Sequence, residues 1–257
     1  MRRAVAVLVA LPLALAACGS GGSSSSQQQQ SISPVAYVTG AAKKTAGVTS
    51  EHVELNGSTS VSGQAVTFTG SGDFDTPSKQ GALHMEMNAG GLNVPMDVTL
   101  DGTTVYVRSP LISDSLPKGK TWLSFDLAKG LAERGIDVSQ FGAQRPGDTL
   151  AQMQAVGTAR PVGDETLDGV ETTHYRGTID PAKIPQGAKV KALTGAKYAP
   201  YDIWIGKDDG LVHRMRFGYA LKGTTMRFAM DFSKFGQDVN VTVPSASETV
   251  DATKGSH

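Results

Sequence analysis

Hydrophobic and polar residues alternate along residues 53–107 with a period of two. Alternation of this kind is typical of β-strands that turn one face to a core and the other to water. The apolar positions form short groups separated by Gly, Asn and Asp, which favour hairpin turns. These groups are Val53 and Leu55; Val66, Phe68 and Phe74; Leu83, Met85 and Met87; Val94, Met96, Val98 and Leu100; and Val105 and Val107. The pattern predicts an antiparallel meander covered on one face only.

The last third of the chain repeats this pattern. Its apolar positions are Tyr201, Ile203 and Ile205; Leu211, His213, Met215, Phe217, Tyr219 and Leu221; and Met226, Phe228, Met230 and Phe232. Turn sequences separate the three groups, at Asp208-Asp209-Gly210 and Lys222-Gly223. We also expect strands near residues 122–125, 159–162 and 172–179, and a last edge strand along 239–243.

One segment at the start of the folded part shows helical spacing. Pro34–Ala46 carries Val35, Val38 and Ala42 on one side, and Ser33 before the proline is a suitable N-cap. Shorter helices are expected at 127–134, at 149–156 and within 181–193. These elements predict an α+β fold: a strongly curved antiparallel sheet, a half-barrel of about ten strands, with short helices packed on its concave face.

A sheet of this form can leave a cavity between strands and helices, and methionine suits surfaces that fit variable apolar partners. Six methionines lie on the apolar side of predicted strands. The alternative for each of them is that it simply fills the core, whereas their clustering on both halves of the sheet favours a shared cavity. The predicted cavity residues are Leu83, Met85, Met87, Val94, Met96, Val98, Met215, Phe217, Met226, Phe228 and Met230. His213 falls among them and is either a headgroup contact or a buried histidine bonded to the backbone.

The N-terminus has the layout of a bacterial lipoprotein signal. Arg2 and Arg3 precede an apolar run that is too short to span a membrane, and Leu15-Ala16-Ala17-Cys18 looks like a lipobox. Cys18 is the one cysteine of the chain, so it has no disulfide partner, and acylation explains it. The alternative is a secretory signal with a chance cysteine. We expect an anchor in the cell membrane, on its extracytoplasmic face.

These observations divide the chain into four parts. Residues 1–17 form the signal peptide, and 18–33 hold the acylated cysteine and a flexible Ser/Gln tether. Residues 34–244 form a single domain. Residues 245–257 form a polar tail that we expect to be frayed.

Charge and motifs exclude several classes of function. The chain has 24 basic and 24 acidic residues, and loss of Arg2 and Arg3 leaves 22 against 24, a net charge of −2. A nucleic-acid partner would call for a basic surface. The Gly-x-Ser-x-Gly motif is absent, and Gly119-Lys120-Thr121 lacks the first P-loop glycine because position 114 is Asp. We expect no enzyme, no cofactor and no metal, since the histidines are scattered one per strand.

The lipobox, the tether and the helix followed by amphipathic strands occur with two further stretches, YAPYDIWIGKDDGLVHRM at 198–215 and VGDETLDGVETTHYRGTI at 162–179. Together they resemble actinobacterial lipoproteins of the LppX/LprG type, which are similar in fold to the LolA/LolB lipoprotein carriers. The resemblance implies a half-barrel with a hydrophobic cavity for lipid acyl chains. It supplies no catalytic motif and does not name the ligand.

The sequence therefore predicts a monomeric, membrane-anchored protein that binds a lipid or acylated glycolipid for transport or presentation at the cell envelope. A non-enzymatic sensor or scaffold of the same fold, with a protein partner, is the alternative. A hydrolase would require His and Asp side chains gathered in one cleft.

Overall fold

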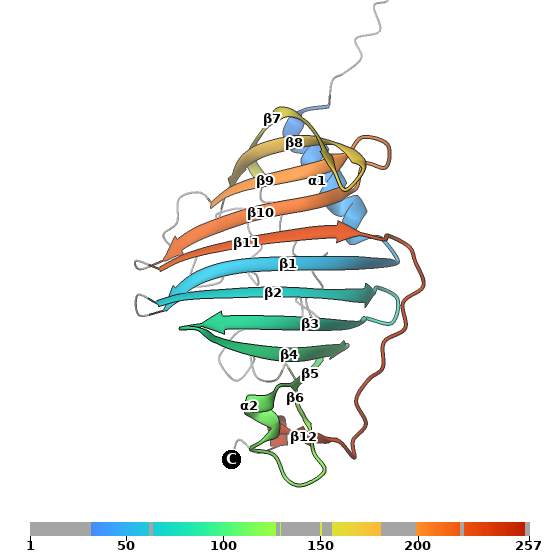
Figure 1. Cartoon of the computed structure of the whole chain (residues 1–257). Coiled ribbons are helices and arrows are strands. Elements are labelled where there is room, and N and C mark those ends of the chain that lie inside the picture. Colours follow the sequence, from blue (N-terminus) through green and yellow to red (C-terminus); the bar gives the residue numbers. More distant parts are fainter. Residues whose placement is uncertain are drawn as a thin grey trace, which may run out of the picture. The chain divides into compact units, whose positions relative to one another are not determined.

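The computed structural model describes residues 32–61, 64–126, 129, 150, 156–180, 199–221 and 224–254. All of them belong to one compact unit, Ile32–His257. Twelve strands form a single curved sheet in this unit (Figure 1). The strands are β1 (Ser50–Val61), β2 (Gln64–Asp75), β3 (Gln80–Ala89), β4 (Leu92–Asp101), β5 (Thr104–Arg108), β6 (Trp122–Asp126), β7 (Val156–Leu167), β8 (Val170–Ile179), β9 (Ala199–Gly206), β10 (Val212–Leu221), β11 (Thr224–Ser233) and β12 (Thr249–Asp251).

The strand order is β12-β6-β5-β4-β3-β2-β1-β11-β10-β9-β8-β7. Two meanders, β1 to β6 and β7 to β11, are joined side by side through the antiparallel pair β1–β11. Every pair is antiparallel except β12–β6, which is parallel. Strands β7 and β12 each have one neighbour, so the sheet stays open. The predicted curved antiparallel sheet is confirmed, with twelve strands where about ten were expected.

Helix α1 (Pro34–Ala46) has the bounds that the sequence predicts. The Ser33 side chain accepts a hydrogen bond from the backbone N–H of Ala36 at 3.2 Å, and the helix ends at Gly47. It packs against β7, β9 and β10 (Figure 1). The Thr45 hydroxyl locks it there, because it accepts from the backbone N–H of Val212 at 2.8 Å and donates to the carbonyl of Ala41 at 2.9 Å.

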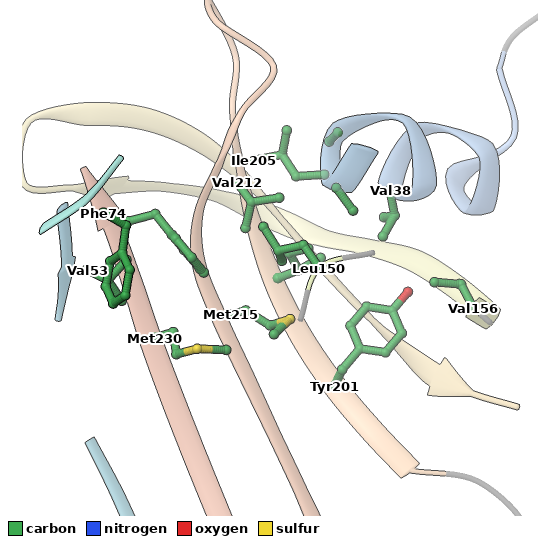
Figure 2. Packing of buried hydrophobic residues seen from close by; sticks show 14 residues of the cluster. Val38, Val53, Phe74, Leu150, Val156, Tyr201, Ile205, Val212, Met215 and Met230 are labelled. Atoms are coloured by element: carbon green, nitrogen blue, oxygen red, sulfur yellow. The ribbon is translucent and has the colours of Figure 1, made fainter. Parts of the chain in front are cut away.

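The buried core lies between α1 and the strands at the centre and the β7 side of the sheet. In Figure 2, Val38 of α1 lies among core side chains of β9 and β10, and Met230 of β11 extends the cluster along the sheet. The cluster comprises Val38, Ala41, Ala42, Val53, Phe74, Leu150, Val156, Tyr201, Ile203, Ile205, Val212, Met215, Met230 and Phe232. We call the sheet face that carries this cluster the inner face, and the opposite one the outer face.

The predicted edge strand along residues 239–243 is wrong, since these residues form no regular structure. Strand β11 already has β1 and β10 as neighbours, so no sheet position is free beside it. The chain continues to the far edge and pairs there as β12 with β6. Part of the expected frayed tail is thus a strand, followed by the 3-10 turn η5 (Ala252–Lys254).

The other helices include one that was not predicted and three that the described residues do not test. The short helix α2 (Pro110–Ser113), which packs on β4 and β6, was not predicted. The helices expected at 127–134, 149–156 and within 181–193 lie almost wholly outside the described residues, as do the signal peptide, Cys18 and nearly all of the tether. Among the described residues, no helix is long and apolar enough to cross a membrane.

Candidate functional site

The strand register brings all eleven predicted cavity residues to the inner face. Met85 lies opposite Met96 and Met87 opposite Val94 in the pair β3–β4. The same rows continue through β2, β1, β11 and β10, so that Met230 and Met215 share the row of Met85. Residues from the two ends of the sequence therefore form one continuous apolar surface.

These residues differ in how far the protein's own side chains cover them. Met215 and Met230 are buried, with exposed fractions of 2% and 9%, and belong to the core around α1. Val94 is also buried. The other eight are half-buried: Leu83, Met85, Met87, Met96, Val98, Phe217, Met226 and Phe228. The part of the inner face that keeps accessible apolar area thus lies on β3, β4 and the hairpin β10–β11.

Three half-buried phenylalanines form an aromatic row on this surface: Phe217 on β10, Phe228 on β11 and Phe68 on β2. The rings of Phe217 and Phe228 stack with centroids 5.1 Å apart, and those of Phe228 and Phe68 lie 5.4 Å apart. Gly57 of β1 stands between Phe228 and Phe68 in the register. A Cβ there would lie 2.0 Å from Cζ of Phe68, so the glycine lets that ring lie flat on the strand.

Phe68 was absent from the predicted site, although its alternation with polar neighbours places it on the apolar side of β2. The predicted set was chosen around the methionines of the strands, so Phe68 was left out. The signal that identifies it is Gly57, since a glycine within an apolar strand marks a close approach of another group. This row is flat, apolar and half-open, which suits contact with hydrocarbon chains.

His213 does not follow the alternation that the sequence suggests. A bulge between Val212 and Arg214 shifts the register, so Val212 and Met215 both reach the core while His213 is the extra residue. Its Nε2 lies 2.9 Å from a carboxylate oxygen of Asp209, and its ring meets the edge of Phe235. The imidazole thus bonds to a carboxylate side chain. The alternative of a buried histidine predicts a backbone partner.

Each of the four strand histidines has a carboxylate neighbour. His52 contacts Asp73 at 2.6 Å and His84 contacts Asp97 at 2.8 Å. These partners could not be predicted from the sequence, because they lie on adjacent strands. No three His, Cys, Asp or Glu side chains in the described ranges are arranged to hold a metal ion.

His174 is the most enclosed of these histidines. Its two ring nitrogens contact Glu165 at 2.9 Å and Asp202 at 2.7 Å, and its ring stacks on Trp204 with centroids 4.1 Å apart. The indole N–H of Trp204 donates to Glu165 and holds the pKa of that carboxyl below its usual value, and the contact with His174 acts in the same direction. The group ties β7, β8 and β9 together on the outer face.

The described residues also form a small polar cavity of about 260 Å³, lined on the sheet side by His52, Asp73 and Ala82. These three residues share one register row, and their parity places them on the outer face. This cavity is therefore distinct from the inner apolar surface.

Comparison with solved structures defines the class of fold. The crystal structure of lipoprotein LppX from Mycobacterium tuberculosis aligns with 81% of this chain and 97% of its own, at 20% identity and a TM-score of 0.51. That of LprF from Mycobacterium bovis aligns with 83% and 97%, at 19% identity and the same score. At such identity the likeness concerns the fold alone.

The family follows from the sequence. A model of the family described as LppX_LprAFG lipoprotein matches residues 33–241, and the chain belongs to this family. A curated relative, an uncharacterized 31.2 kDa protein in the rplA-rplJ intergenic region of Streptomyces griseus, is 32% identical over 150 residues. That match covers 52% of this chain and 48% of the relative, so the chain spans about half the relative's length. The predicted family is confirmed.

Proposed function

We propose that this lipoprotein binds lipid acyl chains against the inner face of its sheet and is held at the cell membrane through acylated Cys18. The bound molecule is a lipid or an acylated glycolipid, which the protein shelters for transport or presentation at the extracytoplasmic side of the membrane. The chemistry needs no catalytic group and no cofactor, because the work consists of removing hydrocarbon from water.

The observation that carries this proposal is the aromatic row with the half-buried aliphatic residues beside it. Phe217, Phe228 and Phe68 lie in contact along one line of the inner face. Met87 lies next to Phe68 in the register and extends that line onto β3. Extended apolar surfaces that stay accessible in a folded protein mark binding sites for apolar partners.

The energetics favour such a role. Each CH₂ group taken out of water contributes about 0.8 kcal/mol. Two acyl chains of ordinary length thus gain enough from an apolar surface to stay bound without any covalent step. The same arithmetic explains the anchor, because a single chain binds a membrane only marginally whereas two or more on one cysteine hold it firmly.

A pair of adjacent residues on β2 tests the proposal. Phe68 lies in the aromatic row, and Thr69 is exposed on the opposite face. The change Phe68→Asp places a charge on the predicted binding surface, and we expect it to weaken binding of a fluorescent fatty acyl probe at least tenfold, since an unpaired carboxylate is costly beside hydrocarbon. Thr69→Asp puts the same charge into water and should leave probe binding as in the unchanged protein.

Two results would count against the proposal. One is an unchanged protein that binds no acyl probe and carries no lipid when it is extracted from its own host. The other is an equal effect of the two aspartates. Either would favour the alternative, a scaffold of the same fold that binds a protein partner.

A further inference from the structure

The outer face carries a polar cavity that lipid binding does not use. Its sheet side is the row His52, Asp73 and Ala82, one residue from each of β1, β2 and β3. Its other wall is the connection that leaves β11 and runs past the strands towards β12 (Figure 1). This connection contributes Lys234, Gln237, Asp238, Val239, Asn240 and Val241.

The connection is fixed to the sheet at the edge of the cavity. The backbone N–H of Gly236 donates to the carbonyl of Ser50 at 3.0 Å, and the Ser50 hydroxyl donates to the carbonyl of Gln237. Ser50 is buried. Lys234 and Gly236 both have positive φ, 50° and 72°, which bends the chain sharply as it leaves β11. The wall of the cavity is thus held to β1 by one backbone bond and one bond from a side-chain hydroxyl.

Ala82 explains why there is space above the sheet. On β3 the outer positions are otherwise large and polar, His84, Glu86 and Asn88. Ala82 is exposed and has a single methyl group, so the row of His52 and Asp73 opens into a hollow at β3. A larger side chain at position 82 would fill the hollow without touching the core.

The lining offers hydrogen-bond donors and acceptors in mixed order and little net charge. Asp73 and Asp238 provide acceptors, Lys234 provides donors, and Gln237 and Asn240 provide both. His52 engages Asp73 through Nδ1. One lysine against two carboxylates gives a net charge of −1 with a neutral His52. Such a lining does not favour a small anion over a neutral polyol.

We infer that this cavity binds a single pyranose sugar unit. Sugar hydroxyls act as both donors and acceptors, which matches the carboxylates and amides, and the C–H face of the ring can lie against Val239 and Val241. The volume of about 260 Å³ is below the ~300–1,000 Å³ typical of drug-sized sites and has room for one such ring. An anchored protein with this site holds an envelope sugar on the face opposite its lipid surface.

Ligand titration followed by ¹H–¹⁵N NMR tests the inference on the chain carrying Cys18→Ala. The probes are glucose, N-acetylglucosamine and inorganic phosphate, each added separately. We expect one of the sugars to shift the backbone signals of His52, Asp73 and Asn240 in a saturable way. Ala82→Phe should weaken binding of that sugar at least tenfold, which corresponds to a loss of ~1.4 kcal/mol in binding free energy. Asn88→Phe, on the same strand and face outside the cavity, should not.

Three outcomes would overturn the inference. The first is no shift at these positions with either sugar up to about 0.1 M, far above the ~1 mM of a weak site. The second is an equal response to phosphate alone, which identifies an anion site. The third is sugar binding that withstands both Ala82→Phe and Asp238→Ala, the latter an exposed position on the connection. Because the acyl probe reports on the inner face, its result and this one are independent.

Discussion

At the scale of single residues, Tyr201 shows how burial makes stability depend on pH. The side chain is 1% exposed within the core, and its hydroxyl donates to the carbonyl of Thr158 at 3.0 Å. Burial raises the pKa of the Tyr201 phenol well above its usual value near 10, because the phenolate would lose its hydration there. In the unfolded chain the phenol ionises at its usual pKa.

The sign of the effect follows from linkage. Above pH ~10 the unfolded state binds fewer protons than the folded state, so the free energy of unfolding falls as pH rises. We expect Tyr201→Phe to cost about 1 kcal/mol at neutral pH, the worth of one hydrogen bond. Above pH 10 the difference should shrink and then reverse. Denaturant unfolding at pH 7 and pH 11 measures it, and a constant difference would contradict the assignment.

Single residues also show where sequence reasoning stops. The alternation placed all eleven cavity candidates on one face, and the register confirms that placement. The partner of Asp73 could not be found this way, because His52 precedes it by 21 positions and meets it only through strand pairing. The bulge at His213 escaped for a related reason: a local shift of register leaves no trace in the pattern.

At the scale of elements, one buried hydroxyl adds a specific bond to the packing that holds α1 on the sheet. Thr45 is fully buried and accepts the backbone N–H of Val212 across 167 residues of sequence. Thr45→Val keeps the shape but leaves that N–H without its acceptor, and we expect it to lower the free energy of unfolding by about 1–3 kcal/mol.

A matched variant separates the hydroxyl from the packing. Thr45→Ser keeps the acceptor and removes a methyl group, so it should cost only about 1 kcal/mol. Thermal unfolding of the two variants compares them. If Ser proves as damaging as Val, or Val is harmless, the bond between α1 and β10 does not have the role assigned to it.

Prediction of the elements was accurate where the signal is local. Helix α1 matched to the residue because a cap, a proline and a helical spacing coincide in one stretch. The prediction of a strand along residues 239–243 was wrong although its valines alternate well. A strand also needs a neighbouring strand with an unpaired edge, and β11 has none. Likewise β12 has only three residues and depends on β6, so its own sequence could not reveal it.

At the scale of the whole molecule, the proposed anchor and the proposed binding surface belong to separate parts of the chain. The proposed anchor is the acylated thiol of Cys18, whereas the sheet lies within the unit Ile32–His257. We therefore expect Cys18→Ala to release a folded protein into the medium of its host. Immunoblots of membrane and medium fractions measure this. Retention of the variant in the membrane fraction would contradict the proposed anchor.

The most direct test of the central claim is native mass spectrometry of the Cys18→Ala protein purified from its own host. We predict a species heavier than the chain by the mass of one acylated lipid, released on activation, and a marked loss of that species in Phe68→Asp but not in Thr69→Asp. A protein that carries its own mass alone, under conditions that preserve lipid complexes of a control carrier, would contradict it.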